Sequence, residues 1–285
     1  MIDPSFLDEL DRFEVTTKRE TDALRRGEQD SRRVGEGLTF SDFRRYAPGD
    51  DTRLVDWKVF ARTDEYFVKQ FEEERNLTVH VLLDSSASMD FGDGAAHKFE
   101  YGAKLALGYA YLTAEENNDF RFSTFGPETD RLDAGRSTRG ELLRLIDLLN
   151  GTEPTGSADF ARAFESYAGG IHSRSLVVIV SDFLADPDAI ETGLAALSGN
   201  DVVLAQVLAP AELSPAVSGD TVFEDPETET SVRSYFGAAR AEGYRDRLDG
   251  HVAEIERRGD ALGATHALVD TGADFFESFA SVWVG

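Results

Sequence analysis

Oxygen-bearing side chains recur at alternate positions in the stretch VHVLLDSSASMDFG, residues 79–92. An apolar run ends at Asp84, and Ser86 and Ser88 follow it at intervals of two residues. A second apolar run, SLVVIVSD, ends at Asp182. Carboxylate and hydroxyl oxygens are the ligands that a hard divalent cation such as Mg²⁺ prefers. The pattern therefore predicts a divalent-cation site, provided that the fold brings the two runs together.

The order of elements along the chain offers a way to bring them together. From residue 76 to residue 285, apolar runs alternate with helical patterns, which is typical of a doubly wound, mainly parallel, Rossmann-like α/β sheet. Ligands of such sheets bind where the carboxyl ends of the strands converge. We therefore expect Asp84 and Asp182 to lie close together if their strands are neighbours. Residues 1–75 have scattered aromatics and turn signals, and they are expected to form a small β-rich N-terminal region.

A purely structural explanation competes with the metal site. Asp and Ser at strand ends commonly cap turns and the following helix. Capping is the preferred explanation for Ser85 alone. For Asp84, Ser86, Ser88 and Asp182 taken together, metal binding is the preferred explanation.

Two segments carry a resemblance to known proteins. The residues DSSAS resemble the DxSxS metal-ion-dependent adhesion motif of von Willebrand factor type A domains. The longer run GEGLTFSDFRRYAPGDDTRLVDWKVFARTDEYFVKQFEEER resembles the signature of the DUF58 family, in which it precedes an A-type domain. The resemblance implies that Ser86 and Ser88 bind the metal directly, while Asp84 and Asp182 hold it through waters. A partner's carboxylate would complete the shell, and the implied ion is Mg²⁺, with Mn²⁺ or Ca²⁺ as alternatives.

The chain departs from the A-type pattern at one ligand. Type A domains usually supply a Thr from a G-x-T-D-L loop before a helix, and PTGSADFARAF places Ala158 at the corresponding position. Thr155 or Ser157 would then have to supply the hydroxyl. The metal is accordingly expected to bind weakly, or only together with a partner.

The resemblance implies a non-enzymatic, metal-dependent protein-binding module. The implied partners are an AAA+ ATPase of the MoxR type and a client protein, with this chain as an adaptor in complex assembly. The alternative is a Mg²⁺-dependent phosphoester hydrolase or phosphotransferase, resembling the haloacid-dehalogenase group, with Asp84 as nucleophile. That chemistry needs a second acid two residues on, where this chain has Ser86. The binding module is therefore the preferred hypothesis.

Composition restricts the setting of the protein. Acidic residues number 54 against 29 basic ones, giving a net charge of -25, and Cys is absent. At about 1 M salt the Debye length is roughly 3 Å, so such a charge is tolerated in a salt-rich cytoplasm, as in a halophilic archaeon. The charge disfavours nucleic-acid binding. No apolar run approaches the ~18 residues of a membrane span, so a cytoplasmic protein is expected.

Overall fold

The structure is a computed structural model, and it describes residues 1–14, 39–45, 65–72, 77–215, 219–224, 226–227 and 230–284. The chain forms two compact units, Met1–Thr17 with Leu77–Gly285, and Lys18–Asn76. In the second unit, strands β1 (Thr39–Arg45) and β2 (Phe67–Glu72) pair antiparallel. Most of the segment that resembles the DUF58 signature lies outside the described residues.

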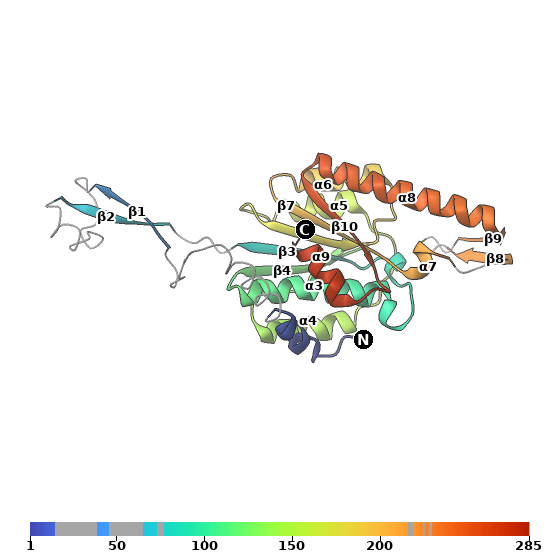
Figure 1. The fold of residues 1–285 in the computed structure, drawn as a ribbon, viewed down its shortest axis with the longest axis horizontal. Coiled ribbons are helices and arrows are strands. Elements are labelled where there is room, and N and C mark those ends of the chain that lie inside the picture. Colours follow the sequence, from blue (N-terminus) through green and yellow to red (C-terminus); the bar gives the residue numbers. More distant parts are fainter. Residues whose placement is uncertain are drawn as a thin grey trace, which may run out of the picture. The chain divides into compact units, whose positions relative to one another are not determined.

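The larger unit is built on a six-stranded sheet in the order β10-β7-β6-β3-β4-β5 (Figure 1). Its first five strands are parallel, and the short strand β5 runs antiparallel to β4 at the edge. Buried parallel strands of this kind must be covered on both faces, and helices pack on both faces of this sheet. The predicted doubly wound α/β fold is therefore confirmed. The strands are β3 (Thr78–Asp84), β4 (Asp119–Phe125), β5 (Thr129–Arg131), β6 (Leu176–Ser181), β7 (Asp201–Leu208) and β10 (Ala264–Asp270).

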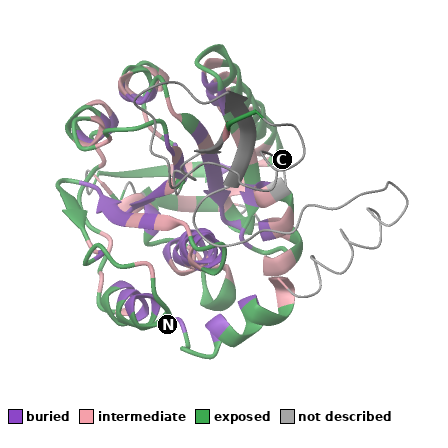
Figure 2. Cartoon of the chain, turned by 90° about the vertical axis from the view of Figure 1, so that its left-hand side faces the viewer, coloured by how far each residue is buried: buried purple, intermediate pink, exposed green. Residues whose placement is uncertain are grey.

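Helices cover both faces of this sheet, and two apolar cores result. Buried residues lie along the strands and on the inward sides of the helices (Figure 2). One face is covered by α3 (Lys98–Glu115), α4 (Arg139–Asn150) and α9 (Phe275–Val284). The other is covered by α5 (Phe160–Ala168), α6 (Pro187–Ala196) and α8 (Ala238–Ala261).

The chain start packs on the α/β unit, which differs from the predicted division at residue 75. Residues 6–14 are helical, and Phe6, Leu7 and Leu10 are buried in the same core as α3. Phe13 stacks on Phe276 of α9 with ring centroids 5.4 Å apart. Burial of this apolar face explains why the first residues belong with the α/β unit rather than with β1 and β2.

Two short insertions lie near the carboxyl ends of the strands. After β3 the chain forms the 3-10 turns η2 (Ala87–Met89) and η3 (Gly94–Ala96) before α3 begins. After β7 it forms the short helix α7 (Pro210–Leu213) and a hairpin of β8 (Gly219–Glu224) and β9 (Ser231–Phe236). This second insertion precedes the long helix α8.

The contact between α5 and α6 depends on a glycine. A Cβ at Gly193 would lie 2.6 Å from the backbone oxygen of Phe160 and 2.9 Å from the Phe164 ring. We expect Gly193→Ala to lower the free energy of unfolding by about 1–3 kcal/mol through overpacking. In α8, a Cβ at Gly250 would have no atom within 4 Å. Because Gly destabilises a helix interior relative to Ala, Gly250→Ala should raise the free energy of unfolding by about 0.5–1 kcal/mol. Urea denaturation of the two variants at one KCl concentration tests the contrast, and equal effects would contradict it.

Candidate functional site

The loop after β3 and the neighbouring strand β6 each fix the Asp84 carboxylate with one hydrogen bond. Asp84 ends the strand and is 1% exposed. The Ser86 backbone N–H donates to Asp84 Oδ1 at 2.8 Å, and the Ser181 hydroxyl donates to Oδ2 at 2.6 Å. Ser181 comes from β6, the neighbour of β3 in the sheet. The adjacency that the prediction required is therefore present.

The two predicted hydroxyl ligands lie side by side. Ser86 Oγ and Ser88 Oγ are 3.1 Å apart, with Ser86 buried and Ser88 half-buried. Ser85 is directed elsewhere: its N–H and its hydroxyl both donate to the Phe125 carbonyl of β4, at 2.7 and 3.1 Å. Ser85 therefore joins the loop to β4, which agrees with the structural role expected for it.

The loop before α5 is joined to the loop after β3. The Thr155 N–H donates to the Ser85 carbonyl at 2.9 Å, and the Ala87 N–H donates to the Gly156 carbonyl at 2.8 Å. Gly156 has φ +66°, and a Cβ there would lie 2.4 Å from the Pro127 ring. Thr155 and Ser157 are exposed, while Ala158 packs against the core under α5. Both candidate hydroxyls are thus on a loop that is fixed beside Ser86.

A buried ammonium ion lies at the same edge of the sheet. Lys98, the first residue of α3, is 1% exposed. Its Nζ donates to Asp182 Oδ2 and to Glu212 Oε1 of α7, both at 2.7 Å. The Leu184 N–H donates to the other Asp182 oxygen at 3.0 Å. Buried Lys98 and Asp182 thus form an ion triad with the half-buried Glu212, which we call the Lys98 triad (Lys98, Asp182 and Glu212).

Burial and charge shift the titration of these groups. Burial, followed by the charge of Asp182, raises the pKa of Asp84 to about 7. Burial opposes the charge of Lys98, yet the carboxylates of Asp182 and Glu212 raise its pKa. Burial also raises the pKa of Glu212, although Lys98 opposes the shift. Asp84 thus lacks a direct cationic partner among the described residues, whereas Asp182 has one.

The residues present fit a divalent cation held through hydroxyls. Ser86 and Ser88 offer two adjacent neutral oxygens, and both oxygens of Asp84 already accept hydrogen bonds from the protein. A carboxylate engaged in this way suits contact with a cation through water. A cation nearby would also favour the ionised form of Asp84, which burial disfavours. When bound, it would offer a positive centre to a further oxygen ligand.

Sequence reasoning missed Lys98, Glu212 and Ser181. One signal existed for Lys98, since it is the first residue of a helix whose following turns are almost entirely apolar. A long cationic side chain there must either reach solvent or find buried carboxylates. Glu212 and Ser181 carry no comparable signal in the sequence, because their roles depend on contacts with distant segments.

The chain is similar to a known protein family and to several known proteins. A family described as "Protein of unknown function DUF58" matches residues 42–251, most of the chain. The chain belongs to this family. This DUF58 protein is 27% identical over 276 residues to the uncharacterized proteins Rv1480 of Mycobacterium tuberculosis and Mb1516 of Mycobacterium bovis. Each match covers 96% of this chain and 87% of the relative.

Solved structures similar to this DUF58 protein include three with low sequence identity. BatB from Bacteroides thetaiotaomicron is 15% identical, with a TM-score of 0.46 over 73% of this chain and all of that one. An aerotolerance-related membrane protein from Bacteroides fragilis is 16% identical, with a TM-score of 0.48 over 73% and 97%. The SpRpn10 VWA domain is 12% identical, with a TM-score of 0.42 over 72% and 93%. Likenesses of this strength carry no functional information about the DUF58 chain.

Among the residues that the structure describes, no helix of this DUF58 protein is both long enough and apolar enough to cross a bilayer.

Proposed function

We propose that this DUF58 protein is a non-enzymatic binding module that takes up a divalent cation at the Ser86 and Ser88 hydroxyls and uses it to bind an acidic side chain of a protein partner. The observation that carries the proposal is the hydroxyl pair, 3.1 Å apart, beside a buried carboxylate that the protein itself holds in place. Two neutral ligands leave a cation more net positive charge than two directly bound carboxylates would. Such a cation readily accepts another carboxylate.

The state of Asp84 favours binding over hydrolysis. A nucleophilic carboxylate must be ionised and able to reach the substrate. Asp84 is 1% exposed, both its oxygens accept protein hydrogen bonds, and burial raises its pKa to about 7. Ser86 lies where a phosphotransferase of this kind would need its second acid. These features support a module without turnover of its own.

The family resemblance suggests the partner and the setting. We propose a MoxR-type AAA+ ATPase as the partner that supplies the carboxylate, together with a client protein, in a cytoplasmic location. The net charge of -25 supports a salt-rich cytoplasm. Binding assays should therefore be made in molar KCl, where repulsion between surface charges is screened.

Removing one hydroxyl tests the proposal. We expect Ser86→Ala to weaken Mg²⁺ binding at least about tenfold. Substituting even a residue that only orients a metal ligand commonly lowers metal affinity by that factor. Calorimetry in molar KCl measures this. Ser85→Ala is the matched control, since the Ser85 hydroxyl bonds to the Phe125 carbonyl, and it should bind Mg²⁺ like the wild type.

Capture of a partner gives the second measurement. The tagged wild type should retain an AAA+ ATPase from native extract in the presence of Mg²⁺, and Ser86→Ala should retain much less. Undiminished capture by Ser86→Ala would contradict the proposal. So would phosphoester hydrolysis by the purified protein that disappears in Asp84→Asn.

A further inference from the structure

A basic pocket lies on the α5 side of the sheet, toward the amino ends of β3 and β4. Its volume is about 310 Å³. Of its lining residues, which all belong to the described part of the chain, none is acidic, although the protein's net charge is -25. The polar side chains that matter most are His80, Arg121, Ser123, Thr129, Arg131 and Tyr167.

Polar residues occupy sheet positions that would ordinarily be apolar. His80 of β3 pairs with Arg121 of β4, and Ser123 of β4 pairs with Arg131 of β5. Leu82, which points to the same side as His80, is fully buried in the core under α5. Burying polar groups destabilises a protein unless they are hydrogen-bonded. The change from an apolar to a basic surface therefore requires an explanation.

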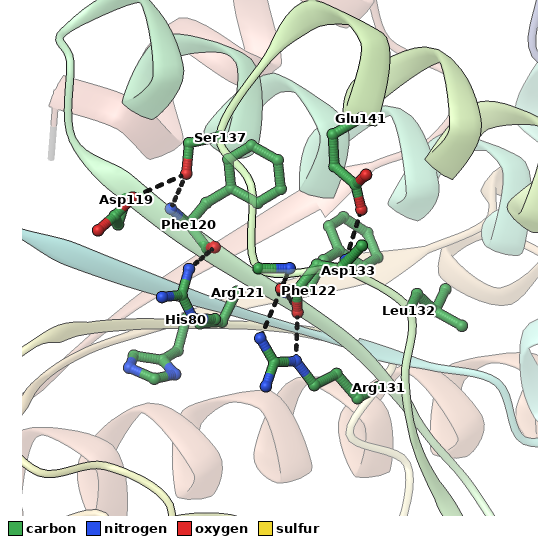
Figure 3. Close-up of polar contacts among 12 residues, drawn as sticks. His80, Asp119, Phe120, Arg121, Phe122, Arg131, Leu132, Asp133, Ser137 and Glu141 are labelled. Atoms are coloured by element: carbon green, nitrogen blue, oxygen red, sulfur yellow. Dashed lines mark hydrogen bonds and ion pairs between the residues drawn. The ribbon is translucent and has the colours of Figure 1, made fainter.

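The side chains of the pocket are held in place. Tyr167 lies in the last turn of α5, and its hydroxyl is 3.0 Å from His80 Nδ1. The two rings pack edge to face with their centroids 5.6 Å apart. Arg131 donates two hydrogen bonds to Asp133, at 2.9 and 2.8 Å. Arg121 donates to the Phe120 carbonyl at 2.7 Å. Figure 3 shows His80, Arg121 and Arg131 on one side of the strands. Such fixed side chains form a pocket before any ligand arrives.

The charge of the pocket comes from Arg121. Asp133 offsets the charge of Arg131, while no carboxylate of the described residues forms an ion pair with Arg121. Burial and the charge of Arg121 lower the pKa of His80 to about 4, so its imidazole is neutral at pH 7. Burial raises the pKa of Tyr167 to about 12, so its hydroxyl keeps its proton. Arg121 is thus the guanidinium of the pocket without a carboxylate partner among the described residues, and the groups around it are neutral apart from the Arg131–Asp133 pair.

We propose that this pocket binds a small organic oxyanion, either a carboxylate or a phosphate monoester, with Arg121 as its charge partner. A guanidinium presents a planar fork of donors that matches both groups. The hydroxyls of Ser123 and Thr129 supply further donors at the wall. The volume of about 310 Å³ is near the lower limit for small-molecule sites, which suits a ligand of a few carbon atoms. This binding does not depend on the cation site at the other end of the strands.

Calorimetry with two probes tests the proposal. Potassium succinate and glycerol phosphate, each titrated at fixed ionic strength, distinguish a carboxylate ligand from a phosphate ligand. We expect at least one to bind, and Arg121→Gln to weaken it at least about tenfold, since hydrogen bonds to charged groups contribute that much. Arg174→Gln removes the same charge from an exposed residue paired with Asp201, and it should bind like the wild type.

A second variant protects the test against misfolding of the first. Tyr167→Phe keeps the ring over His80 and removes only the hydroxyl, so it should fold normally and weaken the same probe by a smaller factor. Binding of either probe that is lost in Arg121→Gln and kept in Arg174→Gln would support the pocket. Failure of both probes to bind the wild type, or equal binding by the wild type and a folded Arg121→Gln, would overturn it.

Discussion

Replacing Lys98 with methionine will lower the free energy of unfolding by about 3–5 kcal/mol, because breaking a buried ion pair leaves uncompensated charge in the interior. The ammonium ion is 1% exposed and lies 2.7 Å from oxygens of both Asp182 and Glu212. Methionine fills a similar volume, so the decrease in the free energy of unfolding measures the effect of the lost charge rather than that of a cavity. Chemical denaturation at constant KCl measures the change.

A half-buried lysine in the same helix provides the control for Lys98. Lys104 pairs with Glu100 at 3.1 Å, and its side chain is 23% exposed. Lys104→Met should change stability by less than about 1 kcal/mol, as is usual for surface pairs. The double variant Lys98→Met with Glu212→Gln should recover part of the loss, since one of the two stranded carboxylates is gone. Equal stability of Lys98→Met and Lys104→Met would show that the triad does not stabilise the fold.

The metal-free protein will lose stability from one buried acid as pH rises from about 4 to about 7. Folded Asp84 keeps its proton up to about pH 7, whereas the unfolded chain releases it near 3.8. Between these values the folded state binds more protons, so its stability falls with rising pH. The difference between 3.8 and about 7 corresponds to about 4 kcal/mol at most. Denaturation in a chelator at several pH values measures it.

Asp84→Asn isolates this contribution. The pKa of His80 is lowered to about 4 by burial and by Arg121, so His80 gives the opposite slope over part of the same pH range. Subtracting the Asp84→Asn curve from the wild-type curve removes the contributions that both proteins share, including that of His80, and leaves that of Asp84 together with its interaction with Asp182. A wild-type curve parallel to that of Asp84→Asn would contradict the raised pKa.

Sequence reasoning succeeded where local patterns determine structure. Alternating strands and helices sufficed for the doubly wound sheet, and the ends of β3 and β6 meet because the two strands are neighbours. That adjacency could only be stated as a condition, since strand order depends on packing of the whole chain. The alternation of β3 and β4 places His80 and Arg121 on one side, but their proximity follows from a register that the sequence does not reveal.

Charged residues that meet across long stretches of sequence were the ones missed. Lys98 and Glu212 are separated by 114 positions, and neither has a neighbour in the sequence that indicates the other. The start of the chain was misplaced for a similar reason. The helix at 6–14 is amphipathic, and its pattern does not tell which apolar surface of the protein it covers.

The Lys98 triad also makes the edge of the sheet sensitive to the insertion after β7. Glu212 lies in α7, and the chain continues from there into the β8–β9 hairpin, whose Val232 and Tyr235 side chains are 59% and 70% exposed. Because Glu212 is a member of the triad, any displacement of α7 would change the distance from Glu212 to Lys98, and with it the electrostatic potential at Asp182.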